Sequence, residues 1–180
     1  MTPQGAGPDI VQEDVEAIVA LVARFEHARQ NALPDAFLEL FRRDALCSTP
    51  YGTALSGIDE IGDFARRVLP ETAVQPLTSA VEMEYIHFLR PDVAAVMIRH
   101  RPVTRDGEPL DALLHRGRDG RKRSRCRKPS EVACRWASPV AAHPGAAPGA
   151  DLHVMTRTDG RWLTAVAQDT TAPEVDPSIG

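Results

Sequence analysis

The stretch Asp151-Leu-His-Val-Met-Thr-Arg-Thr-Asp-Gly-Arg-Trp-Leu-Thr-Ala-Val-Ala-Gln-Asp-Thr170, near the end of the chain, decides the fold. Two candidate strands, 152–157 and 161–169, flank the dipeptide Asp159-Gly160. Asp-Gly is typical of a tight β-hairpin turn, because both positions tolerate a positive φ. The sequence therefore predicts a closing β-hairpin that turns at Asp159-Gly160.

A second pair of extended segments precedes this hairpin. Residues 79–89 and 93–103 are both long candidate strands, and the turn-forming run Arg90-Pro91-Asp92 joins them. The second half of the chain therefore predicts a curled antiparallel sheet.

The beginning of the chain has a helical period instead. Val11, Val15, Ile18, Val22 and Phe25 follow one another at alternating spacings of four and three residues. This spacing places them on one stripe of an amphipathic helix.

Two further helices are predicted. One begins at Pro34, because the first turn of a helix has no acceptor for the backbone N–H that proline lacks. Its apolar face comprises Phe37, Leu40 and Phe41. The other has helical spacing over residues 58–68 and is expected to stop at Pro70. Residues 45–52 and 53–57, between these helices, are expected to form a strand and a short returning arm.

The order of elements predicts an α+β fold. Three N-terminal helices packed on a strongly curved antiparallel sheet leave a cone-shaped hollow, which is a natural ligand pocket. At 180 residues the chain has the length of one domain. We expect that domain at residues 10–170, with flexible tails at 1–9 and 171–180 and an insertion at about 106–149.

The insertion carries a basic segment, Arg116 to Lys128. It holds eight of the 21 lysines and arginines against one acid, although the whole chain has a net charge of −4. It contains glycines and no aromatic residue or apolar period, so a solvated loop is favoured over a nucleic-acid contact. A stretch of sequence that is not matched to the fold is the other alternative.

Composition predicts a soluble protein. Apolar residues make up 43% of the chain and charged residues 26%, and no run approaches the roughly 18 apolar residues of a membrane helix. Residues 1–9 have no signal-peptide pattern, so a cytoplasmic location is expected. The three cysteines have no metal-binding spacing and no dinucleotide or flavin motif is present. We therefore expect no metal and no cofactor.

Several segments together resemble the SgcJ/EcaC group of the SnoaL-like, nuclear-transport-factor-2-like superfamily. They are residues 18–31, 34–41, 57–61, 88–96 and 160–170. Trp162 and Gln168-Asp169-Thr170 carry the resemblance to the group, which typically has Gln-Asn-Thr at that place. The resemblance implies a cone-shaped α+β barrel, a homodimer packed through its sheet and a place in bacterial natural-product pathways.

Ketosteroid-isomerase-type members of the superfamily use a Tyr in the first helix and an Asp before a Pro in the first strand. The resemblance puts Phe25 and Thr49 at these positions, and Asp151 close to a second oxyanion-binding acid. A phenyl ring cannot donate a hydrogen bond, and a hydroxyl without a base cannot abstract a carbon-bound proton. Steroid-isomerase chemistry of that type is therefore disfavoured.

Other polar residues are candidates for the pocket wall. Tyr51 is expected at the rim, and His100 ends the apolar row Ala94, Val96, Ile98, which is expected to face the core. Trp162, Thr164, Val166 and Gln168 share one face of the last strand. A structural role is the alternative for each of them. The predicted ligand pocket comprises Phe25, Thr49, Tyr51, His100, Asp151, Trp162, Thr164 and Gln168.

Two classes of function fit these residues. One is an enzyme or accessory protein that directs cyclisation, isomerisation or hydration of an apolar or polyketide-like ligand. The other is a non-catalytic ligand-binding or dimerisation module. A buried acid or histidine with a perturbed pKa facing the cavity would favour the enzyme, whereas a cavity lined by apolar groups and Gln168 alone would favour binding.

Overall fold

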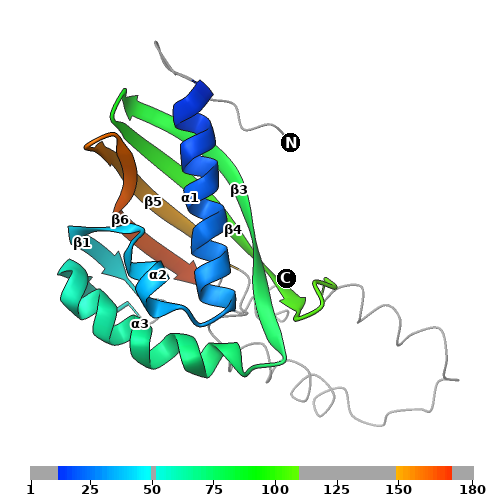
Figure 1. Cartoon of the computed structure of the whole chain (residues 1–180). Helices are drawn as coiled ribbons and strands as arrows, with labels where there is room; N and C mark the ends of the chain where they lie inside the picture. Colours follow the sequence, from blue (N-terminus) through cyan, green and yellow to red (C-terminus); the bar gives the residue numbers. More distant parts are fainter. Residues whose placement is uncertain (1–11, 50–51, 110–148, 172–180) are drawn as a thin grey trace, which may run out of the picture.

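The computed structural model describes residues 12–49, 52–109 and 149–171 of the chain (Figure 1). Its helices are α1 (Gln12–Gln30), α2 (Pro34–Leu38) and α3 (Gly57–Ala73). Its strands are β1 (Phe41–Ser48), β2 (Ala54–Ser56), β3 (Leu77–Arg90), β4 (Val93–Thr104), β5 (Gly149–Thr158) and β6 (Arg161–Thr171). The candidate rim residue Tyr51 and the basic segment Arg116 to Lys128 lie outside the described residues.

The strands form one curved, open sheet in the order β2-β1-β6-β5-β4-β3. All neighbours are antiparallel except β1 and β6, which pair in parallel because the first long strand lies beside the last. In Figure 1, α1 lies across one face of the sheet, and α2 and α3 lie close to β1. The predicted α+β class, with helices on a strongly curved sheet, is confirmed.

The closing hairpin turns where the sequence predicts. Asp159 and Gly160 have φ values of 51° and 75°, the left-handed conformation that a tight hairpin turn requires at both positions. The residues on either side, Thr158 and Arg161, pair with each other. The Asp-Gly dipeptide therefore fixes the register of β5 against β6.

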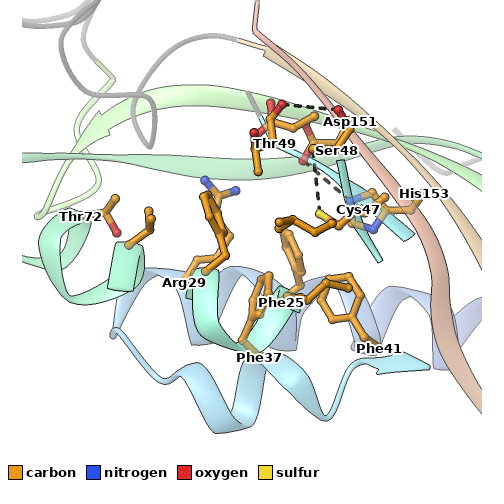
Figure 2. Close-up of a pocket in the computed structure, with 16 residues that line it drawn as sticks. Phe25, Arg29, Phe37, Phe41, Cys47, Ser48, Thr49, Thr72, Asp151 and His153 are labelled. Atoms are coloured by element: carbon orange, nitrogen blue, oxygen red, sulfur yellow. Dashed lines mark hydrogen bonds and ion pairs between the residues drawn. The ribbon is translucent and has the colours of Figure 1, made fainter. Parts of the chain in front are cut away.

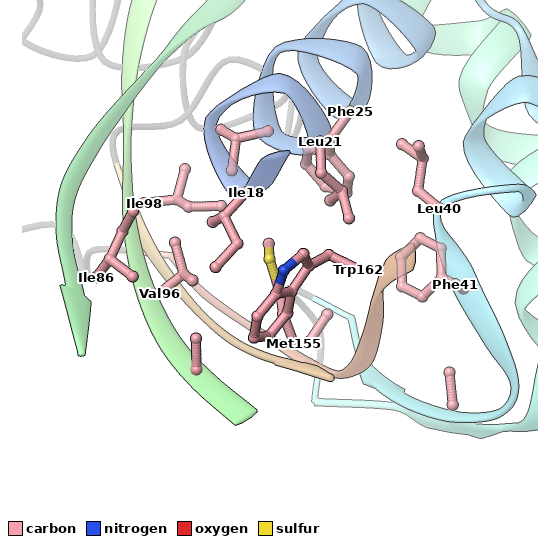
Figure 3. Packing of buried hydrophobic residues seen from close by; sticks show 14 of the residues in the cluster. Ile18, Leu21, Phe25, Leu40, Phe41, Ile86, Val96, Ile98, Met155 and Trp162 are labelled. Atoms are coloured by element: carbon pink, nitrogen blue, oxygen red, sulfur yellow. The ribbon is translucent and has the colours of Figure 1, made fainter. Parts of the chain in front are cut away.

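The apolar stripe of α1 packs against the concave face of the sheet (Figure 3). Ile18, Val22 and Phe25 are buried, as the helical spacing predicts. On β4 the buried row is Ala94, Val96, Ile98 and His100, so the face chosen for the core is confirmed. The C-terminal half of α1 contributes Phe25 and Arg29 to the wall of the pocket.

The third helix runs beyond its predicted stop, because Pro70 lies inside α3. A proline removes one helical hydrogen bond, but the following turn is stabilised from outside the helix. The guanidinium of Arg105 donates to the carbonyl oxygens of Thr72 and Ala73, and also to that of Gln30 at the end of α1. This tertiary cap satisfies carbonyls that a helix end leaves open.

The second helix is shorter than predicted. Leu40 and Phe41 lie after its end, although both are buried. Phe41 begins β1, and the backbone N–H of Thr164 on β6 donates to the carbonyl of Leu40 at 2.8 Å. Pairing with the last strand therefore takes the backbone out of the helix at this point.

A buried polar contact joins the two ends of the described chain. Trp162 Nε1 donates to Oδ1 of Asp14 at 2.9 Å, and Arg157 Nη1 donates to the same oxygen at 2.8 Å. The indole ring also packs edge-on against Phe88, with ring centroids 5.9 Å apart. Trp162 thus belongs to the core that holds α1 on the hairpin.

Among the helices that the structure describes, none is long and apolar enough to cross a membrane.

Candidate active site

A cavity of about 110 Å³ lies between the three helices and strands β1, β5 and β6 (Figure 2). Most of its wall is apolar, and its aromatic rings are in contact: the Phe37 centroid lies 5.2 Å from that of Phe25 and 4.9 Å from that of Phe41. The apolar lining residues are Phe25, Phe37, Phe41, Leu55, Ile61, Phe64, Val68 and Ala167. Such a wall suits an aromatic or aliphatic ligand.

The remaining lining residues are polar. They are Arg29, Cys47, Ser48, Thr49, Thr72, Asp151, His153 and Asp169. Asp151 and His153 are two residues apart on β5 and so share a face, and Asp169 is the cross-strand partner of Asp151 on β6. The pairing of β5 with β6 therefore places two carboxyl groups together in the wall of an otherwise apolar pocket.

Asp151 is held as a carboxylate. His100 Nε2 lies 2.6 Å from Oδ2 of Asp151, and Arg29 Nη1 lies 3.1 Å from the other ring nitrogen, Nδ1. Because a guanidinium only donates, Nδ1 accepts and Nε2–H donates to the carboxylate. Burial by itself would raise the pKa of Asp151, but the interactions with His100 and with His153 outweigh it and hold the pKa below its usual range.

Asp169 has the opposite shift. Burial raises the pKa of its carboxyl group to about 6, and the neighbouring charge of Asp151 adds to the rise, while the charge of Arg29 opposes it. Two adjacent carboxyl groups with pKa values driven apart are the usual basis of acid and base roles. Asp151 keeps its charge near neutral pH, and Asp169 can exchange a proton.

Among the described residues, two polar atoms at this end of the pocket have no hydrogen-bond partner. They are Oδ1 of Asp151 and Nδ1 of His153, in residues that are only 4% and 1% exposed. Buried polar atoms are nearly always hydrogen-bonded, so this pair indicates a site for a proton or a polar ligand group. The His153 ring is positioned by an edge-on contact with Phe25, at 5.1 Å between centroids.

Cys47 also lines the pocket but does not have the properties of a nucleophile. Burial raises the pKa of its thiol to about 11, and the charges of Asp169 and Asp151 add to the shift. The thiolate is the reactive form, so Cys47 stays an unreactive thiol at neutral pH. Its Sγ lies 3.9 Å from the carbonyl oxygen of Ser48, as a weak donor.

Three of the sequence-predicted positions, Phe25, Thr49 and Asp151, lie in the pocket wall. His100 is buried behind the pocket wall, where it contacts the lining residues Asp151 and Arg29. The Oγ1 of Thr49 accepts from the backbone N–H of Thr53 and so shapes the loop after β1. Phe25 supplies apolar surface rather than a hydrogen bond.

The predicted face of the last strand requires a correction. Trp162 and Thr164 are buried in the core outside the pocket, and Gln168 is exposed. The cause is a β-bulge, since Met155 pairs with Thr164 and Val154 with Val166, which leaves Ala165 as an extra residue in β6. One extra residue reverses the alternation beyond it, so Ala167 and Asp169 face the pocket instead.

Sequence reasoning missed Arg29, His153 and Asp169. Two of them had a usable signal, because Arg29 follows Phe25 by one helical turn and His153 follows Asp151 by two strand positions. Asp169 had none, since its orientation depends on the bulge. Within the described part of the chain, no group of three or more His, Cys, Asp or Glu side chains is placed to hold a metal ion.

No protein-family model and no curated protein matches the chain. Solved structures do match. A domain of unknown function with a cystatin-like fold from Nostoc punctiforme has a TM-score of 0.63 and 19% identity, over 94% of this chain and 83% of that one. A ketosteroid isomerase-like protein from Erwinia carotovora atroseptica has a TM-score of 0.57 and 16% identity, over 91% and 100%.

An NTF-2-like protein of unknown function from Shewanella oneidensis has a TM-score of 0.54 and 14% identity, over 87% of this chain and 98% of that one. At these identities the similarity shows the fold alone. The chain has the cone-shaped fold shared by NTF2-like, cystatin-like and ketosteroid isomerase-like proteins.

The opposite shifts of the two carboxyl groups can be measured by carbon NMR of the side chains during a pH titration. We expect Asp169 to titrate with a midpoint of about 6 and Asp151 to stay ionised below the range usual for aspartate. In Asp151→Asn, the Asp169 midpoint should move down, because the repelling charge is removed while burial is retained. An Asp169 midpoint near that of a solvated carboxyl group, or one that Asp151→Asn leaves unchanged, would contradict the coupling.

Proposed function

We propose that the protein is an acid–base enzyme that transfers a proton on a small, largely apolar ligand, in a reaction of the isomerisation, cyclisation or hydration class. The observation that carries this proposal is the Asp151–Asp169 pair in the wall of an aromatic pocket. A binding module needs no such pair, because placing a half-buried carboxyl group beside a buried carboxylate destabilises the fold that contains them.

Asp169 is the proton-transferring group in this proposal. A general base works best when its pKa is close to the working pH, because both protonation states are then available. The apolar wall excludes water from the carboxyl group, and the fixed charge of Asp151 favours the protonated form of Asp169. The hydrogen bond between His100 and Asp151 keeps that charge in place.

The size of the cavity supports a ligand with a single ring. An apolar protein cavity of roughly 150 Å³ binds benzene, and the cavity here measures about 110 Å³. A polyketide-like ligand of several fused rings exceeds this volume. We therefore propose a monocyclic ligand, held among Phe25, Phe37 and Phe41.

Membership of the SgcJ/EcaC group of bacterial natural-product proteins remains a proposal, supported by Trp162 and by the end of β6. The departure from the pattern of the group is informative here. Asp169 stands where the group typically has Asn, and this is the side chain that the bulge turns into the pocket. An amide does not ionise near neutral pH and cannot act as a general base, so the departure gives this chain a titratable group that the usual pattern lacks.

A homodimer packed through the sheet is proposed on the outer face of the sheet. Tyr85, Met97, Leu152 and Gln168 follow one another in register across β3, β4, β5 and β6. Tyr85 is 61% exposed and Leu152 39% exposed. A continuous row of this kind on a sheet face is typical of a surface that another protein covers. Gln168 then belongs to the dimer surface instead of the pocket.

Proton transfer can be tested without knowing the natural ligand. Single-ring ketones, phenols and alcohols are mixed with the protein in heavy water, and ligand-observed NMR records both binding and deuterium uptake at carbon. We expect at least one bound compound to take up deuterium, and Asp169→Asn to keep binding but lower the exchange rate by about 100-fold or more.

Asp159→Asn is the matched control, since Asp159 lies exposed in the turn of the same hairpin. It should exchange at the rate of the unaltered protein. Binding without exchange in the unaltered protein would favour the alternative, a non-catalytic binding module. Equal exchange in Asp169→Asn would remove Asp169 from the mechanism.

The dimer proposal predicts the effect of a charge on the outer sheet face. Leu152→Arg should convert a dimer to a monomer in light-scattering measurements after size-exclusion chromatography, because the row around Leu152 would be buried at the interface. Val74→Arg, at an exposed site after α3, should leave the mass unchanged. A monomeric unaltered protein, or a dimer that persists in Leu152→Arg, would overturn the proposal.

A further inference from the structure

Arg29 is the cationic side chain in the wall of the pocket. It lies one helical turn after Phe25 on α1, half-buried, with its guanidinium carbon 5.5 Å from the centre of the Phe25 ring. Figure 2 shows the guanidinium pointing away from α1 into the region between Thr72 and Thr49. The charge is therefore presented to the pocket instead of the solvent.

The partners of Arg29 are unusual for an arginine. Within the described ranges, no carboxylate lies within ion-pair distance of it, whereas Arg24, Arg42 and Arg99 on the surface each pair with one. Its hydrogen bond within the described ranges runs from Nη1 to Nδ1 of His100, over 3.1 Å. A guanidinium carries five N–H donors in a rigid plane, so donors remain for an oxygen atom in the pocket.

We propose that Arg29 binds the carbonyl oxygen of the ligand and stabilises the oxyanion that forms when Asp169 removes a proton from the adjacent carbon. The ligand is then a monocyclic carbonyl compound with an acidic C–H bond. This inference rests on the proposed function and extends it from proton transfer in general to enolisation.

The charges balance in this step. The carboxylate of Asp169 takes the proton, the electron pair of the C–H bond forms a C=C bond, and the carbonyl π pair moves to oxygen. One negative charge thus leaves a site beside Asp151, where it is repelled, and reaches an oxygen beside Arg29, where it is attracted. Asp169 then returns the proton to a different carbon, or to the oxygen, so no oxidant or further reactant is needed. Preorganised donors at a developing oxyanion are among the largest sources of catalysis.

The groups around this step have fixed roles. Asp151 stays ionised and accepts from His100 Nε2–H, and His100 in turn accepts from Arg29. The imidazole therefore orients the guanidinium as well as the carboxylate. His153, with Nδ1 unpaired, lies on the Asp151 side of the pocket. His100 is a positioning residue, while Arg29 and Asp169 are the catalytic residues of the proposal.

The test uses 4-nitrophenol, a single-ring enolate analogue whose visible absorption reports its ionised form. Asp169→Asn supplies the background, because the amide imitates the protonated carboxyl group of the intermediate. We expect 4-nitrophenol to bind this variant as the phenolate, with its pKa lowered by at least about one unit, which equals a tenfold preference for the anion. In the double variant Asp169→Asn/Arg29→Met, the bound probe should stay neutral, while neutral nitrobenzene should bind both variants equally.

Arg24→Met in the same background is the matched control, since Arg24 is an exposed arginine of the same helix. It should leave the bound phenolate unchanged. A phenolate preference that survives Arg29→Met would overturn the inference, as would the absence of any preference in a variant that binds nitrobenzene. Failure of the proposed function looks different, because carbon-bound protons would then fail to exchange even though the phenolate is bound through Arg29.

Discussion

One buried hydrogen bond, from Nε2 of His100 to Oδ2 of Asp151, governs the polar end of the pocket. Arg29 donates to the other ring nitrogen, so the imidazole carries its proton on the Asp151 side. Asp151 consequently keeps a negative charge in a site that would otherwise favour its neutral form. Because Asp169 is its cross-strand neighbour, that charge adds to the effect of burial and raises the pKa of Asp169 to about 6. The difference between the two carboxyl groups thus depends on the histidines beside Asp151, which lower its pKa, and on burial and the charge of Asp151, which raise the pKa of Asp169.

Much of this arrangement follows from patterns that are visible in the sequence. Side chains alternate between the two faces of β4, and the more apolar row identifies the buried face, with His100 at its end. This prediction holds because β4 pairs with β5 without a bulge. The helical stripe that ends at Phe25 likewise identifies the first helix, and the Asp159-Gly160 turn identifies the closing hairpin. Asp151 could be chosen through the family resemblance, which places it close to an oxyanion-binding acid, and His153 lies two positions later on the same face of the strand.

The parts that could not be predicted depend on contacts distant in sequence. The extra residue Ala165 in β6 is accommodated by pairing with β5, and no local signal marks it, yet it decides that Asp169 and not Gln168 faces the pocket. Pro70 continues a helix because Arg105, thirty-five positions later, caps the helix end. Local propensity failed in both cases because tertiary hydrogen bonds override it.

Neutron diffraction from deuterated crystals grown near pH 5 tests the central claim most directly, since it locates individual protons. The account predicts a deuteron on the carboxyl group of Asp169, none on either oxygen of Asp151, and one on Nε2 of His100 with Nδ1 bare and facing Arg29. A deuteron on Asp151, or one on Nδ1 of His100, would contradict the ordered proton distribution on which the proposed chemistry depends.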